Sequence, residues 1–355
     1  MNKGVISVFS ENTRAELVIL NFVTDYEDPI LGFAHEWIRE LAKSYKSIIV
    51  ISGRVGAVDL PNNVFLKSTG WVKGKKTRNV FRAFYLISVN ILASRPRLIF
   101  THMNYWFCIF AFPASLFVGA RRVLWYAHST GSLSLRVALT LSHKVITPIV
   151  DSFPFSSQKV IAIGHAVDDT KFVLYRKDLS TIKTFVHVGR ADSIKRIDFI
   201  TDTLRNYRKK FSDFDLSFIQ VGSNFRSDET LLKSDFDEDW IKCVESVDRD
   251  RLPNLLIDQK VFLHARLGSI DKAPLEAALA GLIVLTDDPL TYRELGSSEV
   301  MGEYTGLVSQ LEILRELSES ERVKLQYVQR QKVLTNHSIL TLGQRFISAV
   351  AQSQS

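Results

Sequence analysis

The stretch of sequence that decides the fold is Val188-Gly189-Arg190-Ala191-Asp192-Ser193-Ile194-Lys195. An apolar run, Thr184–Val188, ends here in Gly-Arg, and Lys195 follows just before a predicted helix. A strand, a turn and a helix in this order are typical of parallel α/β domains, whose ligands bind at the carboxyl ends of the strands. The planar guanidinium of arginine can bind two phosphate oxygens at once in a fixed geometry, and the flexible side chain of lysine carries a single compact positive charge. The turn therefore suits a diphosphate, although two solvated cations on a surface loop would have the same sequence pattern.

The second informative segment is Leu267-Gly268-Ser269-Ile270-Asp271-Lys272-Ala273-Pro274-Leu275-Glu276-Ala277. We predict that a buried strand, Val261–Ala265, leads into this loop and that a helix opening near Pro274 carries Glu276 in its first turn. A carboxylate in that turn complements the helix N-terminus by about 0.3–1 kcal/mol, which would explain Glu276 without a ligand. The preceding loop and the small residues that follow favour a binding role.

Apolar runs alternate with longer helical patterns along the whole chain, which predicts parallel βαβ units. In the first half we predict strands at 17–23, 47–52, 64–68, 98–101, 122–127 and 144–148, and helices at 31–45, 77–94, 105–118 and 132–142. The pattern restarts with strands at 185–188, 216–221, 241–245, 261–265 and 283–286, and with helices near 198–209, 249–256 and 274–280. A charged stretch with few apolar residues, Asp168–Lys183, separates the halves. We therefore expect an N-terminal domain over 1–168, a C-terminal domain over 169–335 and a final helix over 336–355.

These segments resemble the retaining GT-B glycosyltransferases that assemble bacterial surface polysaccharides. Weaker similarities follow in the expected order at Asp28–Phe33, Thr101–Asn104, Leu124–His128 and Ile163–Asp168. The resemblance implies an α/β fold of the GT-B type, with two Rossmann-like parallel-sheet domains facing one cleft. It also implies that the C-terminal helix crosses back to the first domain.

The resemblance assigns donor-binding roles to several residues. Arg190 and Lys195 would neutralise the diphosphate of a nucleotide-sugar, and Glu276 would hold the ribose hydroxyls. The family usually has an acidic residue that contacts the donor sugar eight positions before this glutamate, where this chain has Gly268. Asp271 and Lys272 are the candidates to replace it.

Three residues of the first half are further candidates. Gly32 follows a predicted strand and opens a helix, as the glycine loop of the family does, and would let backbone amides approach the donor. His128, after a predicted strand, would contact the transferred sugar and is a candidate catalytic residue with Arg190 and Lys195. His102, also at a strand end, is a candidate sugar or acceptor contact. A plain turn glycine and hydrogen-bonded structural histidines are the alternatives, and we expect His165 to be structural.

The function that follows is retaining transfer of a sugar from a nucleotide diphosphate-sugar to a saccharide acceptor, expected to be lipid-linked. The departing phosphate would help to deprotonate the acceptor hydroxyl, so no carboxylate nucleophile is needed. We expect no cofactor and no metal, because the eight histidines are scattered and Asp287-Asp288 suits a polar strand exit. Two alternatives remain open: a sugar-nucleotide epimerase of the same shape, and a non-catalytic nucleotide-sugar-binding subunit, for which Gly268 is the best argument.

Composition limits the remaining possibilities. The 355 residues, 46% hydrophobic and 23% charged, predict an ordinary globular protein of two domains. Only two cysteines occur, Cys108 and Cys243, which favours a reducing compartment. The apolar run Val5–Phe9 is too short for a secretory signal, so we expect a cytoplasmic protein.

The net charge of +7 gathers around one segment, where Lys73, Lys75, Lys76 and Arg78 precede an apolar stretch over 83–93. Such a segment suits an anionic membrane surface, although a loop followed by a core-packed helix would look the same. No recognised DNA- or RNA-binding motif accompanies the charge, so we expect no nucleic-acid partner. The apolar run Tyr105–Ala120 is shorter than the roughly twenty residues that span a bilayer, and we predict a helix buried inside a domain.

Overall fold

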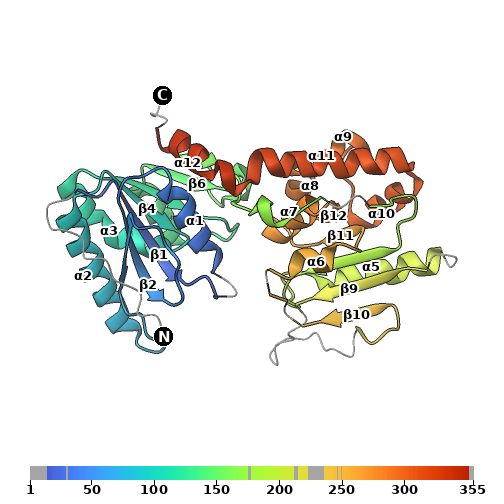
Figure 1. The fold of residues 1–355 in the computed structure, drawn as a ribbon, viewed down its shortest axis with the longest axis horizontal. Helices are drawn as coiled ribbons and strands as arrows, with labels where there is room; N and C mark the ends of the chain where they lie inside the picture. Colours follow the sequence, from blue (N-terminus) through green and yellow to red (C-terminus); the bar gives the residue numbers. More distant parts are fainter. Residues whose placement is uncertain are drawn as a thin grey trace. The chain divides into compact units, whose positions relative to one another are not determined.

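A computed structural model of the chain describes residues 14–28, 31–174, 177–211, 215–222, 236–245, 247–248 and 250–351 (Figure 1). The run Val5–Phe9 lies outside these residues. The chain forms two units. The first comprises Met1–Ala166 and Ile339–Ser355, and the second comprises Val167–Ser338.

The first unit is built on a parallel sheet, as its alternating pattern predicts. Within the described residues the sheet has seven strands, in the order β3-β2-β1-β4-β5-β6-β7. The strands are β1 (Leu17–Thr24), β2 (Ile48–Val55), β3 (Val64–Ser68), β4 (Leu98–His102), β5 (Arg121–Trp125), β6 (Lys144–Thr147) and β7 (Val160–Ala162). The short strand β7 was not among the predicted strands.

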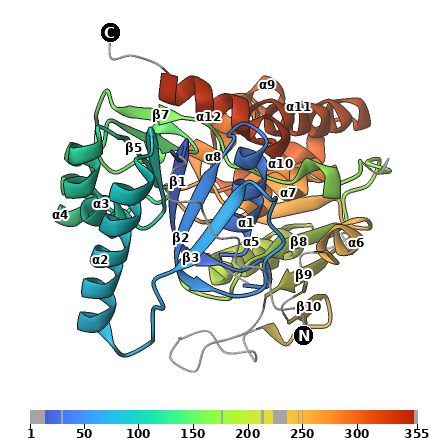
Figure 2. The same ribbon diagram turned by 60° about the vertical axis from the view of Figure 1, so that its left-hand side comes forward.

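Helices cover both faces of this sheet, because successive side chains of each strand point in opposite directions. Leu17 and Ile19 of β1 pack towards α1 (Phe33–Ala42) and α12 (Leu342–Ala351). Val18 and Leu20 pack towards α2 (Lys76–Ser94) and α3 (Tyr105–Val118), beside which lies α4 (Leu133–Leu141). Figure 2 shows α2, α3 and α4 along one side of the sheet. The final helix α12 thus belongs to the first unit, as predicted, with Phe346 against Phe100 and Tyr45.

The prediction that the apolar helix over 105–118 is buried inside a domain is wrong. One side of α3 packs Phe107, Ala111 and Ala114 into the core. The opposite side reaches solvent, where the Phe117 side chain is 86% exposed. The sequence is apolar all round, so it could not indicate which side faces the sheet.

The second unit has a smaller parallel sheet, in the order β10-β9-β8-β11-β12 within the described residues. Its strands are β8 (Thr184–Val188), β9 (Ser217–Val221), β10 (Ile241–Val244), β11 (Val261–His264) and β12 (Ile283–Thr286). Its helices are α5 (Ile197–Lys210), α6 (Leu252–Leu256), α7 (Lys272–Leu279), α8 (Pro289–Glu294), α9 (Ser298–Met301), α10 (Leu307–Glu316) and α11 (Glu319–His337).

Two buried glutamines cover the outer edge of β12. The side-chain amide of Gln329, on α11, accepts from Val284 N–H and donates to Val284 C=O, both at 2.8 Å. Gln310, on α10, makes the same pair of hydrogen bonds to Thr286, at 3.0 and 2.7 Å. These amides satisfy backbone groups that a neighbouring strand would otherwise bind.

Strand order fixes where a ligand site belongs in each sheet. In the second sheet the chain runs outward from β8 to β9 on one side and places β11 on the other. In the first sheet it does the same at β1 and β4. Open parallel sheets bind ligands at the carboxyl ends of strands where the order reverses. The predicted site residues of each unit follow these strands.

Candidate functional site

The turn after β8 is shaped by a histidine beneath it. A Cβ on Gly189 would lie 2.8 Å from His187 Nε2, so a larger residue would displace either the imidazole or the turn. His187 is completely buried, and its Nδ1 lies 2.8 Å from Leu263 C=O. Burial above all, with the nearby charge of Lys195, lowers the pKa of His187 to about 3. The ring is therefore neutral near pH 7, with Nδ1–H donating to Leu263.

Asp192 contacts both residues that are predicted to bind the diphosphate, Arg190 and Lys195. One carboxylate oxygen lies 3.0 Å from the Arg190 guanidinium, and the other accepts the backbone N–H of Lys195 at 3.1 Å. The Asp192 side chain is buried, whereas that of Arg190 is 54% exposed. Asp192 stands inside the motif that defines the fold, yet the sequence pattern assigned it no role.

The Lys195 side chain reaches across to the loop after β11. Its Nζ lies 2.5 Å from Asp271 Oδ2, and both side chains are only 14% exposed. Arg266 binds the other oxygen of Asp271, Oδ1, at 2.6 Å. His264 Nε2 lies 3.6 Å from Asp271 Oδ2. Burial alone would raise the pKa of Asp271, but His264, Lys195 and Arg266 together hold it well below its usual range. The structure thus brings together the two predicted segments through one buried carboxylate.

Arg266 is a third cation of this site that the sequence analysis missed. It lies two residues after the end of β11, at the same sheet edge as the turn after β8. A basic residue at the carboxyl end of a predicted strand beside the switch point was the signal that could have found it.

Glu276 lies in the second turn of α7, not in the first turn as predicted. The helix begins at Lys272, two residues before Pro274, and no acidic residue stands in its first turn. Because the effect of the helix dipole falls off within one turn, it explains the carboxylate less well than the sequence suggested. Lys272 and Glu276 are both partly exposed.

Gly268 has a left-handed backbone, with φ of 74°, and its N–H donates to Asp288 at 2.8 Å. Asp288 is buried and also caps α8 through Thr291. Asp287 pairs with Arg196 at 2.6 Å. The predicted polar strand exit at Asp287-Asp288 is confirmed. Among the residues that the structure describes, no group of three or more His, Cys, Asp or Glu side chains could hold a metal ion.

The three candidates of the first unit follow adjacent strands at one edge of its sheet. Gly32 precedes α1 after β1, His102 ends β4, and His128 follows β5. A Cβ on Gly32 would lie 2.6 Å from Asp28 C=O, so close backbone packing already requires a glycine there. This contact says nothing for or against a donor.

The histidines of the first unit differ in accessibility. His102 is buried among the rings of Phe33, Trp37 and Phe100, at centroid distances of 5.4, 5.4 and 6.1 Å. His128 is exposed and lies edge-on to Tyr126. His165 is buried beside Trp125, which agrees with a structural role. Of the three, His128 is the one exposed to solvent.

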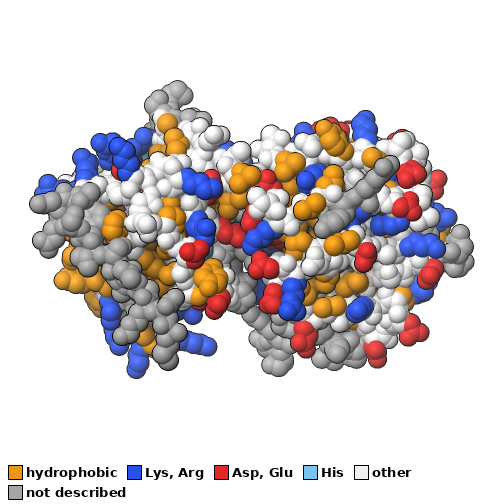
Figure 3. Space-filling model, viewed as in Figure 1, with side chains coloured by type: hydrophobic (Ala, Val, Ile, Leu, Met, Phe, Trp, Pro, Cys, Tyr) orange, Lys and Arg blue, Asp and Glu red, His pale blue; other side chains and the backbone are white. Residues whose placement is uncertain are grey.

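The basic segment lies at the start of α2, on the surface. Lys73, Lys75, Lys76 and Arg78 are all exposed. The helix that follows packs Ala83, Ile87 and Ile91 into the core. It also exposes a stripe of apolar side chains: Phe81, Tyr85, Val89 and Leu92. Hydrophobic and basic side chains both reach the surface of this region in Figure 3.

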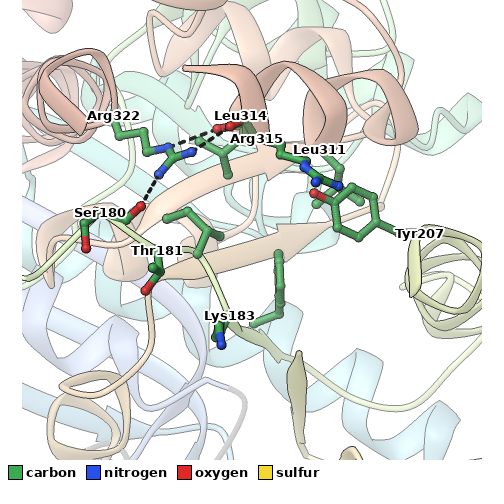
Figure 4. Close-up of a pocket in the computed structure, with 10 residues that line it drawn as sticks. Ser180, Thr181, Lys183, Tyr207, Leu311, Leu314, Arg315 and Arg322 are labelled. Atoms are coloured by element: carbon green, nitrogen blue, oxygen red, sulfur yellow. Dashed lines mark hydrogen bonds between the residues drawn. The ribbon is translucent and has the colours of Figure 1, made fainter. Parts of the chain in front are cut away.

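A cavity of ≈ 140 Å³ lies at the opposite edge of the second sheet, where β8 begins (Figure 4). Arg322 beside it donates to the carbonyls of Leu179, Ser180, Leu314 and Arg315, at 2.7–3.1 Å. These hydrogen bonds tie the segment before β8 to α10 and α11. The cavity is small and its arginine serves packing, so we assign it no ligand.

Comparison with solved structures identifies the fold. A glycosyltransferase from Rickettsia africae ESF-5 is 14% identical, with a TM-score of 0.68, over 96% of this chain and 100% of that one. Anabaena Alr3699/HepE, in complex with UDP and glucose, is 14% identical, with a TM-score of 0.68, over 95% and 99% of the two chains. A putative UDP-N-acetylglucosamine 2-epimerase from Listeria monocytogenes is 12% identical, with a TM-score of 0.60, over 95% and 96%.

No family model and no curated protein matches the sequence. At these low identities the likeness to solved structures shows the fold alone. Both parallel sheets and the helices around them are consistent with it. The chain has the GT-B fold of glycosyltransferases, with two parallel-sheet α/β domains.

Proposed function

We propose that this protein is a retaining glycosyltransferase that moves a sugar from a nucleotide diphosphate-sugar to a saccharide acceptor. One observation carries the proposal: Arg190, Lys195 and Arg266 gather around Asp192 and Asp271 at the switch point of the second sheet. A site with three cations, of which the Arg190 side chain is 54% exposed and can meet an incoming anion, suits a diphosphate. That the solved Anabaena neighbour contains UDP and glucose supports the proposal.

The proposed chemistry depends on charge that develops on the leaving diphosphate. Arg190 and Lys195 stabilise that charge, and Lys195 exchanges its contact with Asp271 for one with phosphate. Glu276 holds the ribose hydroxyls, and Asp271 and Lys272 lie where the donor sugar is expected. The leaving phosphate accepts the proton of the acceptor hydroxyl, so that attack occurs on the face the diphosphate leaves. In this proposal Gly32 and His128 serve the donor and the transferred sugar, His102 serves the acceptor, and no metal or cofactor takes part.

The test is release of nucleoside diphosphate from a panel of nucleotide-sugars, with and without saccharide acceptors. Arg190→Gln and Lys195→Gln should each lower turnover about a hundredfold, the usual loss when one preorganised charge-stabilising donor is removed. Lys209→Gln, which removes an exposed cation of α5, is the matched control and should leave turnover unchanged. NMR of the product anomer tests retention. Near-parental rates in both site variants would disprove the diphosphate assignment.

The same assay separates the two alternatives. An epimerase, suggested by the fold of the Listeria neighbour, would convert the sugar of the donor without any acceptor. A non-catalytic subunit would bind nucleotide-sugar and release nothing, and the absence of an acidic side chain at Gly268 is the observation that favours it.

We also propose that the acceptor is lipid-linked and that the first unit binds an anionic membrane surface from the cytoplasmic side. The support is the exposed side of α2, where Lys73, Lys75, Lys76 and Arg78 adjoin the apolar stripe that begins at Phe81. Phe84 of α2 contacts Phe110 of α3, and Phe110 contacts Trp106, which extends the apolar surface onto a second helix. No helix among the described residues is long and apolar enough to cross a membrane.

Each cation near an anionic surface contributes about 1 kcal/mol, screened by salt. We expect salt-sensitive binding to vesicles that contain phosphatidylglycerol and little binding to phosphatidylcholine alone. Replacing Lys73, Lys75 and Lys76 with Glu should abolish the binding. The matched control, which replaces the exposed Lys183, Lys209 and Lys324 of the second unit with Glu, should retain it. Equal sedimentation of both variants with the vesicles would argue against the membrane proposal.

A further inference from the structure

A basic pocket lies at the edge of the first sheet opposite to the edge that carries Gly32, His102 and His128. It has a volume of ≈ 460 Å³ and is open to solvent. It forms where β5 and β6 begin and where α4 ends. Its basic lining residues are Arg121, Arg122, His143, Lys144 and Lys159.

Two of these cations are held rigidly by neutral acceptors. Arg122 is buried and donates to Leu141 C=O at 2.7 Å and to Ser115 Oγ at 3.0 Å. Lys159 donates to the carbonyls of Thr140 and Ser142, both at 2.9 Å. The Arg122 guanidinium also lies over the ring of Phe112, 5.0 Å from its centroid. These partners fix the side chains without cancelling their charge, so the pocket is preorganised and positive.

Lys144 and Arg121 add charge that the protein does not balance. Lys144 is only 5% exposed, and among the described residues its ammonium has neither a hydrogen bond nor an ion pair. Arg121 is exposed. Among the residues that the structure describes, none of the five basic lining residues forms an ion pair with a carboxylate. Burial, together with Arg122, Arg121 and Lys159, lowers the pKa of His143, as expected beside uncompensated cations. Cations held close together repel one another, and a bound counter-charge would relieve that repulsion.

Apolar side chains border the pocket on two helices. Leu116 follows the lining residue Phe112 by about one turn of α3 and is exposed. Val137, exposed on α4, precedes the lining residue Leu141 by one turn. Residues one turn apart share a helix face, so the pocket rim is partly apolar.

We propose that this pocket is a second anion site of the protein, which binds a phosphate group. Arginine and lysine held in fixed positions suit phosphate oxygens, and a pocket of this volume can hold a phosphate or a diphosphate. The group comes either from a free phosphate or from a lipid headgroup whose chains meet Leu116 and Val137. The site is independent of the donor-binding residues, all of which follow strands at their carboxyl ends.

The test uses the full chain and two probes: inorganic pyrophosphate, followed by calorimetry, and phosphatidylcholine vesicles with or without phosphatidic acid, followed by sedimentation. Arg121→Gln and Lys144→Met each remove one charge and keep most of the side-chain volume. Each should weaken binding of the effective probe about tenfold or more, as expected for one charge-assisted hydrogen bond. Lys46→Gln, an exposed cation of the same unit outside the pocket, is the matched control and should change little.

Loss of pyrophosphate binding in the two pocket variants would establish a free phosphate as the ligand. Loss confined to phosphatidic acid vesicles would establish a headgroup. Both variants leave the second unit intact, so the binding that they lose belongs to this pocket and not to the donor residues. Parental binding of both probes by Arg121→Gln, or an equal loss in Lys46→Gln, would overturn the proposal, as would failure of the parent protein to bind either probe.

Discussion

Asp271→Asn is the substitution that best tests how the candidate site works. The Asp271 carboxylate contacts Lys195 at 2.5 Å and Arg266 at 2.6 Å, and it is 86% shielded from solvent, since 14% of its side chain is exposed. It therefore balances two cations that a donor diphosphate would otherwise attract. Removing its charge should destabilise the free protein and, at the same time, strengthen binding of a nucleoside diphosphate. A loss of stability together with a gain in nucleotide affinity distinguishes a carboxylate that balances the diphosphate cations from one that only stabilises the fold.

The contacts of Asp271 determine how large the loss of stability and the gain in affinity should be. Removing one partner of a buried ion pair costs about 3–5 kcal/mol, and asparagine retains one acceptor oxygen, so we expect about 3 kcal/mol. For a unit of this size, that loss lowers the melting temperature by about 6–12 °C. Releasing the cations should tighten UDP binding by about tenfold, which corresponds to 1.4 kcal/mol. Differential scanning calorimetry measures the first effect and isothermal titration calorimetry with UDP the second.

Asp287→Asn is the matched control for this prediction. Asp287 pairs with Arg196 at 2.6 Å, is 16% exposed and directly follows the neighbouring strand β12. Its substitution should lower stability in the same way without tightening UDP binding. If Asp271→Asn binds UDP no more tightly than the parent, the carboxylate does not counterbalance the diphosphate cations, and that reasoning is refuted. Repeating the titration with a UDP-sugar shows whether Asp271 also contacts the sugar, because that contact would offset the gain.

Three further predictions concern the second unit. Glu276→Gln should weaken UDP binding and Glu276→Ala should weaken it further, since the amide keeps one acceptor for ribose; equal affinities by calorimetry would contradict the ribose role. Because the folded pKa of Asp271 lies below its unfolded value of about 3.9, its stabilisation is present above about pH 4 and is lost as pH falls towards the folded pKa. The difference in melting temperature between the parent and Asp271→Asn should therefore shrink from pH 6 to about pH 3, and a constant difference would count against the pKa direction. Gly189→Ala should destabilise by about 1–3 kcal/mol, because its Cβ would overlap His187 Nε2; unchanged urea unfolding would show that the turn can shift freely.

The predicted strands and helices agree with most of the fold because hydrophobic periodicity is a local property. The helix predicted at 105–118 coincides with α3, and the strand predicted at 185–188 matches β8 except for its first residue. The strand β7 escaped detection because three residues, Val160–Ala162, are too few to show a period. The exposed side of α3 was also unpredictable, because only the neighbouring elements determine which side of an apolar helix is covered.

The candidate site likewise has residues that their sequence neighbours indicate and contacts that form only between segments far apart in the chain. The pattern indicated Arg190 and Lys195 from neighbouring residues, and it indicated Glu276 from its helix. It could not pair Lys195 with Asp271, which lies far along the chain and reaches the lysine only through the adjacency of β8 and β11. Arg266 was missed because its role depends on that same adjacency. Asp192 makes only local contacts, with Arg190 and the backbone N–H of Lys195, and the pattern did not indicate them.

The glutamines that cover β12 have a consequence for how copies of this protein can meet. An open strand edge invites another chain to add a strand, which is the usual first step of strand exchange and fibrous aggregation. At Val284 and Thr286 the positions of an added strand are already occupied by Gln329 and Gln310, both completely buried. An incoming strand would have to displace α10 and α11 before it could form its first hydrogen bond there. At high protein concentration, two copies can therefore come into contact beside β12, but their sheets should not join through backbone hydrogen bonds there.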